Sequence, residues 1–205
     1  MTEVTPDDYV CYFGYGSLVN RDTRPHDEVF VAAVIKGWRR VWSHRVEAPN
    51  RDFGCTSLNV ERHPEATISG VLVRMPMSEL PTLDLRESGY VRIPLDRDDL
   101  VLAPEHASLT RDCRELFLYS SLPKNTSPAN RQRPILQSYV DCVMAGFERV
   151  FGDEGLAAFI DSTRGWQWPR VNDRDDPYYP RAVPLDGESH RHFDELLHAA
   201  ARHAA

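Results

Sequence analysis

The sequence lacks the patterns that mark membrane, secreted and metal-binding proteins. None of its 205 residues belongs to an apolar run near the roughly 20 residues that span a bilayer, and the best run is Val29 to Ile35. The N-terminus MTEVTPDDYV has no basic and then apolar segment of the kind that forms a signal peptide. Its four cysteines, Cys11, Cys55, Cys113 and Cys142, include no C-x-x-C pair, which excludes the spacing of a zinc ribbon or a thioredoxin-like redox site. We therefore expect a cytoplasmic protein with buried, reduced thiols and no membrane partner.

Positive charge is also scarce. The chain has 24 Lys and Arg against 31 Asp and Glu, a net charge of −7 with His counted as neutral. A nucleic-acid binder needs a surplus of Lys and Arg on one face, so no nucleic-acid partner is expected. With 41% hydrophobic and 27% charged residues, the composition is that of an ordinary globular domain and excludes disorder, collagen and coiled coil.

Short apolar runs rich in β-formers dominate the first 120 residues. The strand candidates are Tyr9 to Tyr15, Val29 to Ile35, Trp38 to Ser43, Cys55 to Val60, Ile68 to Met75, Tyr90 to Leu95 and Arg114 to Ser120. A short helix is expected over Ser78 to Glu87, and the proline-containing stretch from Leu122 to Pro134 predicts a loop. Apolar positions spaced i, i+3, i+4 and i+7 predict an amphipathic helix over Ile135 to Phe151, and a second helix follows at Gly155 to Thr163.

Many strands followed by helices indicate an α+β protein rather than alternating βαβ units. We predict a small mixed β-barrel, curved or closed, with flanking helices, formed by residues 1–163. Residues 164–205 are predicted to pack on the same domain as an arm rich in proline and aromatic residues. A short helix over Ser189 to His203 then closes the chain.

The first candidate site is the segment FGYGSL, Phe13 to Leu18. Glycines on both sides of Tyr15 permit backbone angles that are closed to other residues, so the N–H groups of Gly16, Ser17 and Leu18 can point into one concavity. Such a nest binds a carboxylate or phosphate without a cationic side chain. No G-K-[ST] follows it and no third glycine completes a dinucleotide fingerprint, which excludes both of those nucleotide motifs. A tight turn without a ligand is the alternative interpretation.

The second candidate is the segment LDLRESGYVRIPL, Leu83 to Leu95. Glu87 stands between an apolar helical turn and a strand, where a carboxyl can be held at the rim of a pocket with its pKa raised by desolvation. Its charged neighbours Asp84, Arg86 and Arg92 are interpreted as a solvated cluster.

Other polar residues receive ordinary interpretations. His190 and His192 have no Cys or carboxylate partners at a usual spacing, so they are taken as solvated and no metal site is predicted. Arg39 and Arg40 are interpreted as surface charges, with the alternative that one of them faces an acidic substrate. Tyr119 ends a strand and is a candidate for the cavity, with core packing as the default.

The motifs taken together resemble the γ-glutamylcyclotransferase superfamily, especially its cation-transport-regulator-like (ChaC) branch and neighbouring bacterial cyclotransferases. The resemblance is carried by FGYGSL, by GWRRVWS at Gly37 to Ser43, and by LRESGYVRIPL with Glu87. The later stretch SYVDCVMAGF, followed by GLAAF, is similar to the helix that follows the last barrel strand in that superfamily. The matches span Tyr9 to Phe159, and Leu18 occupies the place of an Asn found in relatives that act on other γ-glutamyl compounds.

The resemblance implies an enzyme that needs no metal or redox cofactor, a lyase or acyltransferase that forms 5-oxoproline. Its partner would be a small γ-glutamyl peptide or amine, with glutathione as one candidate. The α-amine of this substrate would attack its own γ-carbonyl, with Glu87 as general base and then as general acid. The substrate-binding residues implied are Phe13, Gly14, Tyr15, Gly16, Ser17 and Leu18, with Tyr119 as a further candidate.

A non-catalytic module that binds a carboxylate or γ-glutamyl ligand is the alternative function. Glu87 discriminates between the two, because a protein that only binds an anion gains nothing from a carboxylate beside it. Its presence favours the enzyme.

Overall fold

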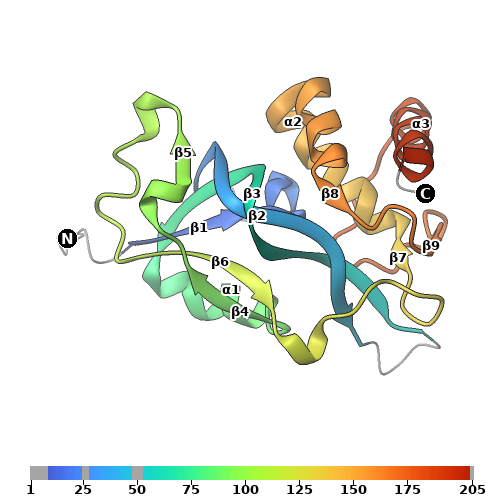
Figure 1. Ribbon diagram of the computed structural model, residues 1–205, viewed down its shortest axis with the longest axis horizontal. Helices are drawn as coiled ribbons and strands as arrows, with labels where there is room; N and C mark the ends of the chain where they lie inside the picture. Colours follow the sequence, from blue (N-terminus) through green and yellow to red (C-terminus); the bar gives the residue numbers. More distant parts are fainter. Residues whose placement is uncertain (1–8, 25–27, 48–52, 204–205) are drawn as a thin grey trace.

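The computed structural model describes residues 9–24, 28–47 and 53–203, so the outer ends of the predicted domain and arm, residues 1–8 and 204–205, lie outside the described residues. Nine strands form one curved sheet with the main order β4-β6-β1-β3-β2-β5 (Figure 1). Their bounds are β1 (Tyr9–Gly14), β2 (Val29–Val46), β3 (Cys55–Pro76), β4 (Tyr90–Pro94), β5 (Leu100–Leu102), β6 (Glu115–Ser121), β7 (Ile135–Leu136), β8 (Thr163–Arg164) and β9 (Arg170–Val171). Because β4 and β5 end the order, the sheet is unclosed. The predicted α+β class with a curved mixed sheet is confirmed, and the closed alternative is wrong.

Two long antiparallel strands, β2 and β3, replace four predicted short ones. The sequence predicts that a strand ends at Gly37, but β2 continues through this glycine with a shift in register between Lys36 and Trp38. Gly37 has φ +77, a conformation that only glycine adopts freely. On β3, residues 61–67 join the two predicted strands. This stretch is extended but polar and mostly exposed, so its sequence has no apolar pattern that predicts a strand.

Strand β1 is the buried centre of the sheet. It pairs with β3 in antiparallel and with β6 in parallel orientation, and its residues from Val10 to Gly14 are buried. Such a strand is covered on both faces, which is why its sequence is a continuous apolar run. The predicted strand is confirmed, and it ends where the segment YGSL begins.

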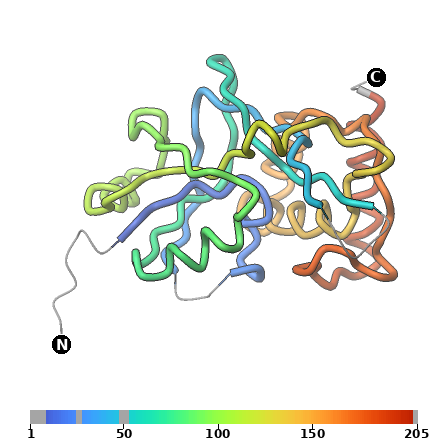
Figure 2. The backbone as a smooth tube through the Cα atoms, turned by 90° about the horizontal axis from the view of Figure 1, so that it is seen from below, coloured from blue at the N-terminus to red at the C-terminus, as the bar shows by residue number. Residues whose placement is uncertain are grey.

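The helices are α1 (Leu80–Arg86), α2 (Gln137–Asp161) and α3 (Gly187–His203). Helix α2 contains a break at Gly152, with φ 67 and ψ −171, so both helices predicted between Ile135 and Thr163 are present. Helices α2 and α3 lie side by side at one end of the molecule (Figures 1 and 2). None of the helices in the described ranges has the length and apolar character needed to cross a membrane.

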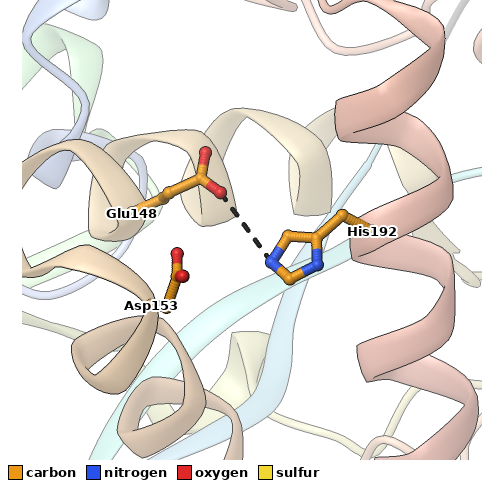
Figure 3. Close-up of side chains that lie close together, drawn as sticks. All are labelled: Glu148, Asp153 and His192. Atoms are coloured by element: carbon orange, nitrogen blue, oxygen red, sulfur yellow. Dashed lines mark ion pairs between the residues drawn. The ribbon is translucent and has the colours of Figure 1, made fainter.

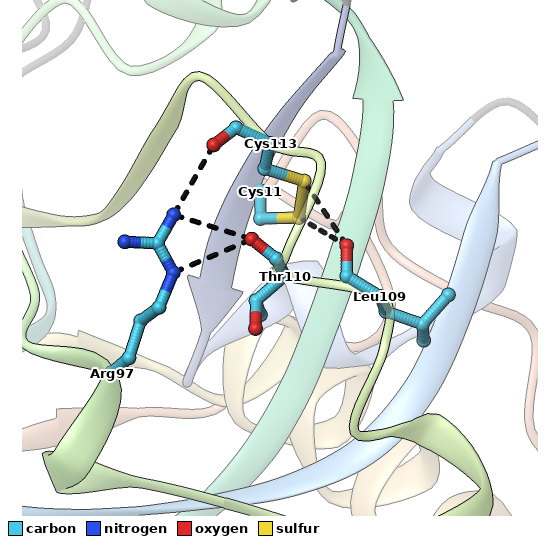
Figure 4. The surroundings of a disulfide bond; sticks show 5 residues. All are labelled: Cys11, Arg97, Leu109, Thr110 and Cys113. Carbon is cyan, nitrogen blue, oxygen red and sulfur yellow. Dashed lines mark hydrogen bonds between the residues drawn. A yellow bond between two sulfur atoms is a disulfide. The ribbon is translucent and has the colours of Figure 1, made fainter. Parts of the chain in front are cut away.

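A disulfide joins Cys11 on β1 to Cys113 in the segment that precedes β6 (Figure 4). The prediction of four reduced thiols is wrong for this pair, because the fold brings residues 102 positions apart to a Cα–Cα distance of 5.9 Å. Cys55 and Cys142 are free and buried, as predicted. Arg97 donates to the carbonyl oxygen of Cys113 at 3.2 Å, which ties the same segment to the turn before β5.

Candidate active site

A cavity of about 450 Å³ lies where the segment after β1, the end of α1, the adjoining parts of β2 and β3, the start of α2 and the C-terminal arm meet. It brings together residues that are far apart in the sequence. Of the predicted site residues, all line this cavity except Gly14. They are Phe13, Tyr15, Gly16, Ser17, Leu18, Glu87 and Tyr119.

The segment after β1 turns into the cavity as a single 3₁₀ turn, Ser17–Val19. The N–H of Val19 donates to the carbonyl oxygen of Gly16 at 2.9 Å. Val19 is the first residue of the turn whose N–H has an acceptor inside it, so the N–H groups of Ser17 and Leu18 have no acceptor within the turn. The predicted nest has three donors, the N–H groups of Gly16, Ser17 and Leu18, and the turn leaves two of them, those of Ser17 and Leu18, without an acceptor of its own.

The glycines of FGYGSL do not use the left-handed backbone conformation, although Gly16, with φ −125 and ψ −130, lies outside the usual extended and helical regions. Among the described residues, left-handed φ values occur only at Gly37, Gly152 and Gly165, and therefore not in YGSL. Space is what the loop requires: a Cβ on Gly16 would lie 3.0 Å from the hydroxyl oxygen of Tyr139, and a Cβ on Gly14 would lie 2.9 Å from the Cβ of Leu18. Glycine lets the loop pack directly against its neighbours.

Glu87 is the C-terminal cap residue of α1. Its N–H donates to the carbonyl oxygen of Leu83 at 3.0 Å, and its own carbonyl accepts from the N–H of Tyr90 at 2.8 Å. These two bonds fix the backbone, and the side chain is 15% exposed. Burial raises the pKa of Glu87, while the charges of Arg86 and Arg181 partly oppose the rise. A carboxyl with a raised pKa is a better proton acceptor near neutral pH than an ordinary glutamate.

Arg86 belongs to the site, and its interpretation as a solvated charge is wrong. Its side chain is only 13% exposed, and its Nε donates to Oε1 of Glu87 at 3.1 Å. The same guanidinium donates to the carbonyl oxygen of Thr23 at 2.6 Å and contacts the hydroxyl of Ser17 at 3.5 Å. One side chain therefore joins Glu87 to the glycine loop. Sequence motifs do not reveal that Arg86 joins these two parts of the site, because arginine side chains are usually solvated.

The rest of that charged cluster is partly exposed. Arg92 lies 3.4 Å from Asp84 and 2.8 Å from Glu115, and all three side chains are at least one-third exposed. Tyr119 connects this cluster to the cavity: its hydroxyl donates to Asp84 at 2.7 Å, and its carbonyl oxygen accepts from the hydroxyl of Tyr15 at 2.7 Å.

Buried tyrosines form much of the cavity wall. Burial raises the pKa of Tyr15, Tyr90 and Tyr139 well above the ordinary value, so their hydroxyls stay protonated and neutral. Two of these hydroxyls already donate hydrogen bonds. That of Tyr15 donates to the carbonyl oxygen of Tyr119, and that of Tyr90 donates to the carbonyl oxygen of Leu58 at 2.8 Å. The sequence analysis missed Tyr90 and Tyr139, since isolated tyrosines carry no motif. The signal for Tyr90 is its place three residues after Glu87.

His44 is a neutral member of the wall that the sequence analysis also missed. Burial lowers its pKa to about 4. Its Nδ1 lies 2.9 Å from the hydroxyl of Ser121, and its ring stacks on Tyr90 with 3.8 Å between centroids. Neighbouring Gly89 leaves room for the imidazole, because a Cβ there would lie 2.7 Å from Nε2.

The C-terminal arm supplies the remaining wall through Tyr178 to Arg181. Asp173 fixes this segment. Its carboxylate accepts from the N–H of Ser138 at 2.8 Å, from the hydroxyl of Ser138 at 2.6 Å and from the N–H of Tyr178 at 2.9 Å. Because Ser138 lies in the first turn of α2, whose N–H groups have no acceptor within the helix, the arm and the helix stabilise each other.

Arg39 and Arg40 lie outside the cavity. Arg39 pairs with Glu61 at the surface, as predicted. Arg40 is 0% exposed, which contradicts its interpretation as a surface charge. Its guanidinium lies 4.9 Å from the ring centroid of Phe147 and 4.8 Å from that of Phe159, so it packs α2 onto the sheet instead of contacting a substrate.

One group of side chains in the described ranges has a spacing that suits a cation. Glu148 and Asp153 on α2 and His192 on α3 can each place one ligand atom within 4.8 Å of the others (Figure 3). Nε2 of His192 lies 3.9 Å from Oε1 of Glu148, and both side chains are more than one-third exposed. None of the three lines the cavity. Their evident role is to join α3 to α2 on either side of the break at Gly152.

Comparison with known proteins supports the architecture. No protein-family model matches the sequence, and no curated protein matches it. A solved γ-glutamyl cyclotransferase is similar over 91% of this chain and 99% of its own, with a TM-score of 0.55 and 16% identity. The human protein loc79017 is similar over 92% of this chain and 99% of its own, with a TM-score of 0.55 and 16% identity.

A third solved structure, YkqA from Bacillus subtilis, has a TM-score of 0.57 and 21% identity. The similarity covers 80% of this chain and 57% of YkqA. Likeness at these identities establishes the fold. The chain therefore has the γ-glutamyl cyclotransferase fold, as the resemblance of its motifs predicts.

Proposed function

We propose that the protein is a γ-glutamylcyclotransferase, which converts a γ-glutamyl peptide or amine to 5-oxoproline and the released peptide or amine. One observation carries the proposal. A buried carboxyl with a raised pKa, Glu87, lines the same cavity as Ser17 and Leu18, whose N–H groups have no acceptor within their own turn. The reaction needs this combination, a base beside an anion-binding loop, because its substrate carries both an ammonium and a carboxylate.

The loop and Glu87 have separate tasks in this reaction. The N–H groups of Ser17 and Leu18 bind the α-carboxylate, and Glu87 accepts a proton from the α-ammonium. The amine nitrogen then attacks the γ-carbonyl carbon, a C–N bond forms, and the bond to the leaving nitrogen breaks. Glu87 gives its proton to that nitrogen and takes the second proton of the attacking nitrogen, which leaves a neutral lactam and a free amine, and then passes this proton to solvent. Because nucleophile and electrophile are parts of one molecule, holding the substrate in a ring-like conformation removes much of the barrier.

The electrostatics of the wall support the same assignment. The neutral tyrosines and the neutral imidazole of His44 add no negative charge beside an anionic substrate. Arg86 keeps Glu87 and the loop in one arrangement through its contacts with both. A pure carboxylate-binding module has no use for Glu87, whose charge would repel the ligand.

The test is release of 5-oxoproline from a panel of glutathione, γ-glutamyl dipeptides and γ-glutamyl amines. We expect Glu87→Gln to keep the fold and substrate binding but to lower kcat by about 10²- to 10⁴-fold, the usual contribution of a general acid–base. The matched control is Glu79→Gln, the same change at the exposed start of α1. A rate near wild type in Glu87→Gln would contradict the mechanism, and no product from any compound would favour the binding module.

A further inference from the structure

Arg181 is the arginine of the cavity wall whose side chain makes no hydrogen bond or ion pair with any residue that the structure describes. The guanidinium of Arg86 is occupied by Glu87 and the loop, and that of Arg45 donates to the carbonyl oxygen of Lys124 at 2.7 Å. Arg181 lines the cavity and is exposed at its mouth. Within the described part of the chain, no carboxylate lies within ion-pair distance of it. Its charge is therefore free to meet a ligand.

The arm holds Arg181 in place by bonds and ring contacts on the residues just before it. The hydroxyl of Tyr178 donates to the carbonyl oxygen of Phe53 at 3.2 Å, and the two rings stack with 5.5 Å between centroids. The ring of Tyr179 packs edge-on against Tyr139 at 4.9 Å. The backbone that carries Arg181 is thus part of the cavity wall and not a free tail.

We propose that Arg181 is a specificity-determining residue that binds a carboxylate on the leaving amine. The favoured substrates are then γ-glutamyl derivatives of amino acids or peptides rather than of simple amines. This inference rests on the proposed function. Ser17 and Leu18 serve the α-carboxylate of the γ-glutamyl group, and Arg86 joins their loop to Glu87. Arg181 is exposed at the cavity mouth whereas Glu87 is largely buried, so its guanidinium can meet the part of the substrate that extends toward solvent.

Two physical arguments favour a carboxylate as the partner of Arg181. A guanidinium offers a planar pair of N–H donors that fits a carboxylate in a two-bond arrangement, whereas an alkyl leaving group has no acceptor for it. The protein as a whole has a charge of −7, so it does not attract an anion over long distances. A local cation at the cavity mouth supplies the attraction where the substrate enters.

The test compares γ-glutamylalanine with γ-glutamylethylamide, two substrates that differ only in the leaving-group carboxylate. Arg181→Gln should raise the KM for γ-glutamylalanine about tenfold relative to the KM for γ-glutamylethylamide. This is the usual effect of losing one charge-assisted bond. The effect of Arg181 on the pKa of Glu87 is common to both substrates and cancels in the ratio. Arg181→Lys should retain part of the preference, and Arg39→Gln, at a surface site away from the cavity, is the matched control.

The possible outcomes separate the two proposals. A KM ratio that stays within about twofold of wild type in Arg181→Gln would overturn the role of Arg181 while leaving the proposed function intact. A parallel rise of both KM values would do the same, because it would place Arg181 on the shared γ-glutamyl part. Absence of 5-oxoproline from either substrate with the wild-type protein would overturn the proposed function, and this inference with it.

Discussion

Glu87 and Arg86 are adjacent in the sequence, and the charge of one sets the proton affinity of the other. Burial raises the pKa of Glu87, and Arg86 is the stronger of the two arginines that oppose the rise. As a general base, Glu87 must be ionised, so kcat/KM should increase as pH rises through this pKa. Arg86→Gln removes a charge that favours the ionised form. We therefore expect the acid limb of the pH profile to move to higher pH.

The measurement is kcat/KM for 5-oxoproline formation from about pH 4 to about pH 9, a span that covers ordinary and raised carboxyl values. The maximum should also fall, since Arg86 contacts Ser17 and Thr23 in the loop. Arg92→Gln is the matched control, because that arginine pairs with partly exposed carboxylates. An acid limb that stays in place or moves to lower pH in Arg86→Gln would argue against Glu87 as the base.

Single residues were predictable where their type is unusual for their position. Glu87, a carboxylate between an apolar turn and a strand, was identified as a site candidate, and it lines the cavity. Arg86 and Arg40 were assigned to the surface because arginine is mostly exposed. Arg40 is buried against two stacked aromatic rings, one from each side of the break in α2. Such surroundings come from the fold and have no local signal.

Among the elements, the 3₁₀ turn after β1 depends on close contact with α2. A Cβ on Gly16 would lie 3.0 Å from the hydroxyl oxygen of Tyr139 and 3.6 Å from Cδ1 of Leu58. Gly16→Val should displace the turn, lower the free energy of unfolding by about 1–3 kcal/mol, and weaken substrate binding. Equilibrium unfolding in urea and KM for 5-oxoproline formation measure the two effects.

The milder change Gly16→Ala tests the cause. If the hydroxyl of Tyr139 is what the new methyl group meets, Gly16→Ala should cost less in a Tyr139→Phe background than in the wild type. Equal costs in the two backgrounds would mean that the glycine serves backbone freedom, as the sequence analysis supposed, instead of space.

The elements themselves were predictable to different degrees. Strand β1 and the two halves of α2 follow directly from apolar runs and helical periodicity, because those residues are buried. Strands β2 and β3 extend through Gly37 and through the polar stretch between Val60 and Ile68, where Glu61, Arg62 and Thr67 pair with β2 although they are exposed. The two-residue strands β7, β8 and β9 are defined by ladders of one or two pairs with residues far away in the sequence, so no local pattern marks them.

At the scale of the whole molecule, the disulfide and the cavity are two of the places where distant parts of the chain meet. The disulfide between Cys11 and Cys113 and the bond between Tyr15 and Tyr119 join residues 102 and 104 positions apart. The arm also returns to the cavity, which it lines with residues 178–181. The sequence analysis predicted an arm anchored by aromatic residues, but its place at the site depends on contacts that no spacing reveals. The domain limits and the cytoplasmic location stay predictions.

Asp173 is the residue that couples the arm to the rest of the fold. Its carboxylate accepts three hydrogen bonds, two from Ser138 at the start of α2 and one from Tyr178 at the cavity. Asp173→Ala removes a capping interaction from α2, which should lower the free energy of unfolding by about 1–2 kcal/mol. It should also lower kcat/KM by about tenfold or more, because the wall formed by residues 178–181 is no longer held in place.

Asp175→Ala is the matched control, an exposed aspartate of the same arm. Urea unfolding measures the stability, limited proteolysis measures the exposure of the arm, and 5-oxoproline release measures the site. If the arm is a structural part of the cavity, Asp173→Ala should raise proteolysis after residue 173 and reduce kcat/KM together. Loss of stability with unchanged kcat/KM would mean that Asp173 supports α2 alone and that the cavity keeps its shape without the arm.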